Sequence, residues 1–184
     1  MRPRPRGEHG NRIVLALGSN LGDRVHHLLG AVGRLADAGL APDSFSSIYE
    51  TPPVGFAGQP DFLNAVVALT SGLPPKDVLS IFQAVEEGAG RVRAFRNGPR
   101  TLDLDLVFYG DRNVRTEGLI LPHPRWKERI FVVRPMLEVV PDFRDPETGL
   151  RVREVAALWP AEPAEIRVRC DAQAFRKTFE EWQR

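Results

Sequence analysis

The amino-acid sequence predicts an α+β protein: a ferredoxin-like, three-layer domain in which helices flank a central, mostly antiparallel sheet. Two observations lead to this class. Apolar residues alternate in some segments and recur at helical spacing in others. The resulting order is strand, helix, strand, strand, helix, strand. With 184 residues the chain has the length of one domain. We divide it into a disordered basic leader (1–11), a main domain (12–159) and a C-terminal extension (160–184).

The first strand and helix are separated by a glycine-rich turn. Residues 13–17 form a short apolar run that suits a buried strand. After the turn at 18–23, apolar residues recur at the spacing of one helix face, and Gly39 is expected to end the helix. The turn lacks the spacing of the GxxxxGK[ST] and GxGxxG phosphate-binding motifs. We therefore assign it turn and capping roles.

Two strands and a long loop follow. Residues 44–50 are expected to form a strand, and residues 62–70 a second one with Phe62 and Asn64 on the same face. Between them, TPPVGFAGQP contains three prolines and two glycines and predicts a loop. A ring and an amide two residues apart can stack on a flat heterocycle and bond its edge. Ordinary packing explains the same pattern.

A second helix is expected to open at Pro74–Pro75, because proline is tolerated in the first helical turn. Its apolar stripe contains Val78, Phe82 and Val85. Gln83 and Glu86 lie on another face, which is either solvated or beside a ligand.

The most informative stretch is Gly90–Tyr109, GRVRAFRNGPRTLDLDLVFY. Glycines and a proline predict that its four arginines lie in a loop. In the strand that follows, leucines point one way and Asp103 and Asp105 the other. Such carboxylates stand roughly 6–7 Å apart and repel one another unless a cation lies between them. Mg²⁺ accepts such ligands together with substrate phosphates, which arginine forks also bind. The pattern indicates a polyphosphate site; the alternative is a set of surface ion pairs.

The remainder of the chain is less specific. Residues 119–124 predict an extended, proline-fixed segment with His123, and a lone histidine there is more often structural than functional. Residues 130–140 predict a buried helix interrupted by Pro135. A short helix, a strand and a polar helix are expected at 152–159, 166–168 and 171–182. We assign no role to the extension.

The composition excludes several classes of protein. The net charge of +1 and the pI near 8.0 give no support to bulk binding of nucleic acid. The single cysteine, Cys170, excludes an intrachain disulfide and a cysteine-based metal cluster and suits a reducing compartment. No apolar run approaches the length of a membrane span, about 18 residues. We expect a cytoplasmic monomer without a nucleic-acid or membrane partner.

Several of these stretches together resemble one known family. GPRTLDLD at 98–105 is similar to the signature of the 6-hydroxymethyl-7,8-dihydropterin pyrophosphokinases. The likeness continues in order through LGSNLG, YETPP, QPDFLN and LPH, and then Arg129 and Phe131. The resemblance implies transfer of the β,γ-diphosphate of ATP to the pterin hydroxymethyl group in folate synthesis, with release of AMP. It also implies Mg²⁺, as two ions, and ATP as co-substrate.

The resemblance further implies roles for individual residues. The turn at Ser19 and Asn20 would border the pterin pocket. Catalytic roles fall on Arg91, Arg100, Asp103 and Asp105, of which Asp103 and Asp105 hold the metal. Pterin-binding roles fall on Thr51, Pro52, Val54, Phe62, Asn64 and Phe131. ATP-binding roles fall on Gln83, Glu86, Arg93, Arg96, His123 and Arg129. The loops at 51–61 and 91–100 are expected to close over both substrates.

The sequence departs from the family pattern at two positions, and it is compatible with two other functions. Asn97 stands where other members carry tryptophan, with Phe95 as the nearest substitute, and Pro124 stands where an aromatic is often found. One alternative is a ferredoxin-like module that binds RNA through the arginine loop and Phe62; it requires a broad basic surface and exposed stacking aromatics. The other is a degenerate member that binds nucleotide without transfer.

Overall fold

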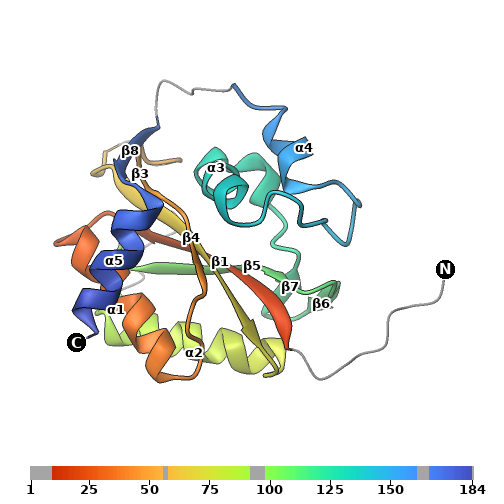
Figure 1. The fold of residues 1–184 in the computed structure, drawn as a ribbon, viewed down its shortest axis with the longest axis horizontal. Coiled ribbons are helices and arrows are strands. Elements are labelled where there is room, and N and C mark those ends of the chain that lie inside the picture. Colours follow the sequence, from red (N-terminus) through yellow and green to blue (C-terminus); the bar gives the residue numbers. More distant parts are fainter. Residues whose placement is uncertain (1–9, 56–57, 92–97, 161–165, 184) are drawn as a thin grey trace.

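The computed structural model describes residues 10–55, 58–91, 98–160 and 166–183, and its helices lie on both sides of one central sheet (Figure 1). The strands are β1 (Asn11–Ser19), β2 (Ser44–Phe45), β3 (Ile48–Thr51), β4 (Phe62–Ser71), β5 (Asp103–Tyr109), β6 (Val114–Thr116), β7 (Leu119–Leu121) and β8 (Arg167–Cys170). The helices are α1 (Arg24–Asp37), α2 (Pro75–Gly88), α3 (Ile130–Val139), α4 (Val152–Ala156) and α5 (Ala172–Trp182), with the 3₁₀ helix η1 (Trp126–Glu128).

The sheet has the strand order that the predicted fold requires. Its order is β5-β1-β4-β3-β8, every paired neighbour is antiparallel, and β2 also pairs with β4. The strands β1 and β3, which α1 connects, are separated by β4, as in a split βαβ unit. The α+β class with an antiparallel sheet and flanking helices is therefore confirmed. A small hairpin of β6 and β7 was not expected from the sequence.

Alternation along the strands divides the core into two layers. Leu15, Leu104 and Leu106 are buried toward α1, α2 and α5, whereas Val107 and its neighbours pack with α3 and α4. Since side chains alternate along β5, Asp103 and Asp105 share the face of Val107. The predicted opposition of leucines and aspartates is thus present, and it directs both carboxylates toward α3.

Two predicted elements differ from the structure. The strand expected at 44–50 is divided into β2 and β3. Between them the Ser46 N–H still donates to the Val66 carbonyl, but the Val66 N–H donates to the Ser46 hydroxyl and the Ser47 N–H to Glu138, so the backbone pairing is incomplete there. The prediction that Pro135 interrupts its helix was wrong. Proline removes one helical hydrogen bond, yet α3 continues through Pro135 because its buried face packs on the sheet.

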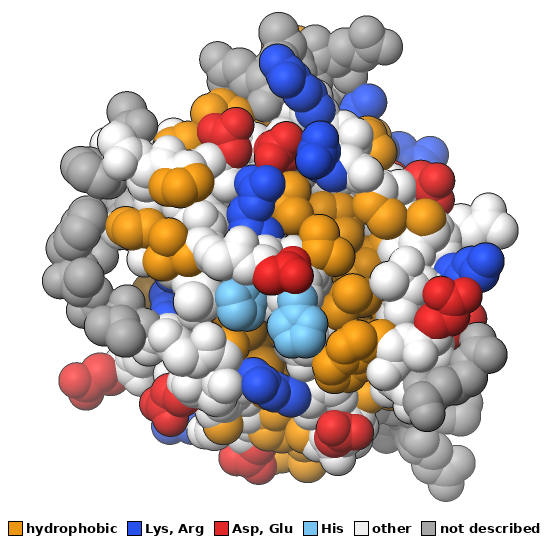
Figure 2. Space-filling model, turned by 90° about the vertical axis from the view of Figure 1, so that its left-hand side faces the viewer, with side chains coloured by type: hydrophobic (Ala, Val, Ile, Leu, Met, Phe, Trp, Pro, Cys, Tyr) orange, Lys and Arg blue, Asp and Glu red, His pale blue; other side chains and the backbone are white. Residues whose placement is uncertain are grey.

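Residues 166–183 join the same layers. Strand β8 pairs with β3 at the edge of the sheet, and α5 packs beside α1 (Figure 1). Phe175 and Phe179 of α5 are buried and both contact Phe45 of β2. None of the helices in the described ranges has the length and apolar character needed to cross a bilayer. On the side that carries α1, basic and acidic side chains are mixed with apolar ones (Figure 2).

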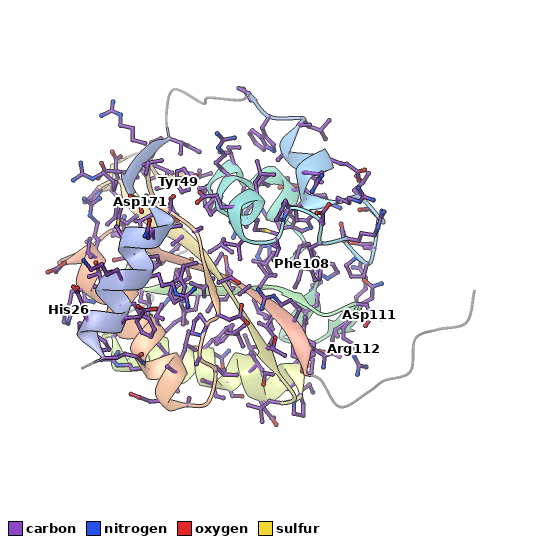
Figure 3. All side chains as sticks on the ribbon, in the orientation of Figure 1. His26, Tyr49, Phe108, Asp111, Arg112 and Asp171 are labelled. Atoms are coloured by element: carbon purple, nitrogen blue, oxygen red, sulfur yellow. The ribbon has the colours of Figure 1, made fainter. Side chains whose placement is uncertain are left out.

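Helix α3 is tied to the sheet by one carboxylate. Glu138 accepts hydrogen bonds from the N–H and hydroxyl of Ser47, at 2.9 Å each, and from the hydroxyl of Tyr49. Tyr49 lies between the sheet and α3 (Figure 3). Burial and then the Glu138 carboxylate raise the pKa of Tyr49, so its hydroxyl remains a donor at neutral pH. This contact fixes α3 relative to β3.

We expect Glu138→Ala to lower the free energy of unfolding by about 2 kcal/mol, because three donors on two buried residues lose their acceptor. Urea denaturation measures the change. Glu180→Ala is the matched control, since its carboxylate pairs with Arg176 on the exposed side of α5, and it should cost less than about 0.5 kcal/mol. Equal losses in the two variants would contradict the anchoring role.

Candidate active site

A pocket lies on the α3 side of the sheet, where β1, β4 and β5 run side by side. Its floor is fixed by strand register: Asp103 is opposite Gly18, and Gly18 is opposite Asn64. Phe62 and Phe131 contribute aromatic rings to the wall, and Asp103 and Asp105 line the same cavity. The pocket therefore joins an acidic end to an aromatic end across three strands.

Gly18 keeps the floor of this pocket open. A Cβ at this position would stand 3.1 Å from Oδ1 of Asn64, 3.7 Å from the Phe62 ring and 3.8 Å from Cβ of Asp103. Its backbone is that of an ordinary strand, so the glycine is needed for space and not for its conformational freedom. The sequence places Gly18 in a turn, and its role in the pocket was missed there.

Arginines neutralise both aspartates in the described structure. Asp103 accepts Nη2 of Arg91 at 2.7 Å and Nη2 of Arg100 at 2.9 Å. Asp105 accepts Nη1 of Arg129 at 2.6 Å. Burial, and then the neighbouring Asp105, raise the pKa of Asp103, and the arginines oppose that rise. The carboxylate pair therefore needs a cation beside it.

His123 is held next to the same carboxylates as a neutral donor. Its Nε2 is 4.0 Å from Oδ2 of Asp105, while its Nδ1 accepts the Arg125 N–H at 3.2 Å. Because Nδ1 is an acceptor, the ring proton of the neutral form is on Nε2. Burial is the main cause that lowers the pKa of His123, so the ring is uncharged at neutral pH and directs an N–H into the site.

Glu86 supports the acidic end of the pocket from the α2 side of the sheet. Its side chain, on α2, accepts the Leu104 N–H at 2.7 Å and forms an ion pair with Arg91. Glu86 is only 5% exposed, whereas Gln83 is exposed, so the helix face that the sequence leaves open is buried at Glu86 and solvated at Gln83. The contact couples α2 to β5 and sets the position of Arg91 beside Asp103.

The aromatic end has a polar edge and two stacked cations. Asn64 donates from Nδ2 to the Thr51 hydroxyl at 2.7 Å, which orients its amide within the pocket. The guanidinium of Arg100 lies 5.2 Å from the centre of the Phe62 ring, and that of Arg129 lies 5.9 Å from the Phe131 ring. Both arginines thus connect an aromatic face to an aspartate.

Asn20 connects two loops that border the pocket. Its amide donates to Oε1 of Gln59 and to the carbonyl of Pro60, at 3.0 and 3.1 Å. Its Oδ1 accepts the Arg100 N–H at 2.8 Å, and its own N–H donates to the Arg100 carbonyl. The neighbouring Ser19 is fully buried.

A buried aspartate supports the segment between His123 and Arg129. Asp145 accepts Nζ of Lys127 at 2.9 Å, the Glu147 N–H at 2.9 Å and the Thr148 hydroxyl at 2.8 Å. Burial alone would raise the pKa of Asp145, but these hydrogen bonds hold it below its usual range. The interaction fixes η1, which positions Arg129 at the pocket.

The structure brings together most of the residues singled out in the sequence. The pocket is lined by Thr51, Pro52, Val54, Phe62, Asn64, Arg100, Asp103, Asp105, Arg129 and Phe131. Arg91 and His123 lie beside the aspartates. Gln83 is exposed and lines a separate hollow with Glu86, Glu87 and Arg91. Arg93, Phe95, Arg96 and Asn97 lie outside the described residues. Arg125 and Glu128, which also line the pocket, were not identified from the sequence.

A carboxylate pair surrounded by arginines beside an aromatic slot is typical of an enzyme that handles phosphates and a flat substrate. The profile of the 7,8-dihydro-6-hydroxymethylpterin-pyrophosphokinase (HPPK) family matches residues 14–141, more than half of the chain. The chain belongs to this family, as its motifs predict.

Individual relatives agree with this assignment. The chain is 45% identical over 151 residues to the 2-amino-4-hydroxy-6-hydroxymethyldihydropteridine pyrophosphokinase of Bacillus subtilis, which covers 81% of this chain and 90% of that protein. It is 41% identical over 140 residues to the folic acid synthesis protein fol1 of Pneumocystis carinii, covering 76% of this chain but only 19% of that longer protein. A Plasmodium falciparum HPPK-DHPS crystal structure is similar with a TM-score of 0.63 and 14% identity, over 82% of this chain and 45% of that one. At that identity the likeness concerns the fold.

We expect Asp145→Asn to lower the free energy of unfolding by about 2 kcal/mol at pH 7, because Asn cannot replace the charged acceptor. The pKa of Asp145 is lower in the folded protein than the unfolded value near 3.9. Its stabilisation is therefore complete at neutral pH and is lost as the pH falls through the folded pKa. Urea titrations between pH 7 and pH 3 should show the two proteins converging below about pH 4. A difference that is constant with pH would contradict this account.

Proposed function

We propose that this chain transfers the β,γ-diphosphate of ATP to the hydroxymethyl oxygen of 6-hydroxymethyl-7,8-dihydropterin, releasing AMP, as a step of folate synthesis. The observation that carries the proposal is one pocket that joins the Asp103/Asp105 pair and its arginines to the Phe62–Asn64 slot. The acidic end suits a metal-bound polyphosphate, and the aromatic end suits a flat heterocycle.

The pterin would lie over the floor at Gly18. Phe62 and Phe131 offer ring faces for stacking, which excludes water from both sides of a flat ligand. The amide of Asn64, oriented by Thr51, is available to bond the polar edge of the ring. Pro52 and Val54 line the more open rim, where Val54 is 59% exposed.

Asp103 and Asp105 would hold Mg²⁺, and the donor set fits that ion. Two carboxylates on one strand face supply hard oxygen ligands, and Mg²⁺ commonly binds one or two carboxylates with waters and substrate phosphates. Within the described ranges no group of three or more His, Cys, Asp or Glu side chains forms an all-protein cage. When bound, the metal supplies charge neutralisation to the phosphates. The expectation of two ions is part of this proposal.

The arginines would move from the carboxylates to the phosphates once a metal ion neutralises Asp103 and Asp105. Among the described residues, the Nε atoms of Arg91 and Arg100 and the Thr101 hydroxyl are buried without a hydrogen-bond partner, which leaves donors for phosphate oxygens. Guanidinium groups stabilise the charge that develops on a transferring phosphoryl group. His123 would donate its Nε2 proton to a phosphate oxygen.

The reaction follows from this placement. The hydroxymethyl oxygen forms a bond to the β-phosphorus and releases its proton to water, and the bond from that phosphorus to the oxygen shared with the α-phosphate breaks, so that AMP leaves with that oxygen. Holding both substrates in line can lower the barrier by roughly 7 kcal/mol or more. Gln83, Glu86, Arg93, Arg96 and Arg129 remain our candidates for binding ATP.

The other expectations are part of the same proposal. We propose a monomer that works in the cytoplasm and has small molecules as its partners. The RNA-binding alternative requires stacking aromatics exposed on a sheet face, whereas Phe62 is 8% exposed and lies in the pocket. The degenerate alternative, in which nucleotide binds without transfer, is decided by the formation of AMP.

We expect Asp103→Asn and Asp105→Asn each to reduce AMP formation at least about 100-fold, because the metal loses a ligand and the phosphates lose compensation of their charge. Chromatography of AMP from ATP, Mg²⁺ and the pterin measures turnover, and EDTA should abolish it in the wild type. Asp111→Asn is the control, since Asp111 is exposed beyond the opposite end of β5 (Figure 3). Normal turnover in both active-site variants would remove the role assigned to the aspartates.

Gly18→Ala should weaken pterin binding roughly ten-fold, because the added methyl group fills the floor and displaces the Asn64 amide. Affinity for a nonhydrolysable ATP analogue should stay within about two-fold. Equilibrium titration of each ligand measures both values. Gly30→Ala is the matched control, since nothing lies within 4 Å of a Cβ at that position in α1. Unchanged pterin affinity in Gly18→Ala would place the pterin elsewhere.

A further inference from the structure

A chain of charged residues connects the C-terminal strand β8 to the loop beside the aromatic slot. The loop lies between Thr51, the last residue of β3, and Phe62, the first residue of β4. Thr51 and Phe62 both line the pocket and are opposite one another in the sheet. The positions of these two chain ends therefore set the shape of the slot.

Arg24 holds both ends of this loop with one guanidinium. Its Nη2 is 2.9 Å from Oε1 of Glu50, and its Nη1 donates to the carbonyl oxygen of Asp61 at 2.8 Å. Glu50 immediately precedes Thr51, and Asp61 immediately precedes Phe62. The side chains of Arg24 and Glu50 are 26% and 19% exposed, so the contact is more sheltered than a surface ion pair.

Strand β8 supplies a second cation to Glu50. Arg169 places its Nε 3.6 Å from Oε2 of Glu50, the oxygen that Arg24 does not contact in this ion pair. The strand itself pairs with β3 along Ile48–Glu50. The family profile ends at residue 141, so β8 lies outside the matched part of the chain.

We propose that Arg24, Glu50 and Arg169 are positioning residues for the pterin side of the pocket, and that β8 contributes to substrate binding through them. This rests on the proposed function, because the ligand of the slot is taken to be the pterin. Glu50 faces away from the pocket, as adjacent strand residues alternate, and acts by fixing the backbone that presents Thr51. Arg24 fixes the backbone that presents Phe62 in the same way.

A positioning role of Arg24, Glu50 and Arg169 differs from general stabilisation of the fold in which ligand affinity it changes. Asp103 and Asp105 are on β5, and the arginines that contact them lie in the 91–100 loop and at the start of α3. None of these contacts involves Glu50. A loosened loop should therefore weaken pterin binding and leave nucleotide binding and the rate at saturating pterin nearly unchanged.

The experiment measures pterin affinity in the presence of Mg²⁺ and a nonhydrolysable ATP analogue, together with analogue affinity, kcat and thermal unfolding. Arg24→Lys should weaken pterin binding about ten-fold, because one ammonium group cannot hold two acceptors in the fork geometry of arginine. Arg169→Ala should weaken it about three-fold, and Arg169→Lys should restore it. The analogue affinity and kcat should stay within about two-fold.

A matched control and a double variant separate this relay from a structural effect. Arg176→Ala removes an arginine that is 58% exposed, the same as Arg169, and that pairs with Glu180 within α5. It should leave pterin affinity unchanged. In the Glu50→Gln background, Arg169→Ala should have no further effect, because Arg169 acts through the Glu50 carboxylate.

Several results would overturn the proposal. Unchanged pterin affinity in Arg24→Lys and Arg169→Ala would remove the positioning role, and so would an equal loss of pterin and analogue affinity. Full additivity in the double variant would remove the link through Glu50. The wild type tests the proposed function separately. Pterin binding without AMP formation would refute the transfer reaction, and the positioning residues would still be tested by the pterin affinities of the variants. Absence of pterin binding in the wild type would refute both.

Discussion

The repulsion between two carboxylates on one face of β5 is the constraint on which the site depends. Asp103 and Asp105 are adjacent on that face because the strand alternates, and burial makes the charge of Asp103 more costly than it would be in water. Arginines from two separate segments, the 91–100 loop and the start of α3, form ion pairs with these carboxylates. The same arginines contact the aromatic walls, so the acidic and aromatic ends of the pocket are electrostatically connected.

The scaffold holds this arrangement through a few polar contacts that reach across layers. Glu138 ties α3 to β3, and Asp145 ties η1 to the turn after α3. Glu86 ties α2 to the backbone of β5 on the opposite side of the sheet. The contacts of Asp145 and Glu86 each join an element that carries a pocket residue to one that does not, whereas Glu138 joins α3 and β3, which both carry one. The pocket is therefore shaped in part by residues that are not in its lining.

The success of sequence-based prediction differed between local patterns and long-range partners. The opposition of leucines and aspartates in β5 was predicted, because strand alternation is a property of neighbouring residues. The continuity of α3 through Pro135 was not, since the packing that offsets a lost hydrogen bond comes from the sheet. The pocket role of Gly18 was missed for a similar reason. A strand glycine indicates close approach, but only register identifies Asn64 and Asp103 as its neighbours.

The sequence by itself determined the order of elements, the layered α+β class, the family and the side chains that carry charge and aromatic rings. These properties depend on spacing along the chain, where periodicity and motif are local. Tertiary structure alone decided which cation meets which carboxylate, and that Glu86 is buried and supports β5. It also decided that the last strand joins the sheet beside β3. Those contacts join residues far apart in sequence, and they form only when folding brings separate strands and helices to a common face.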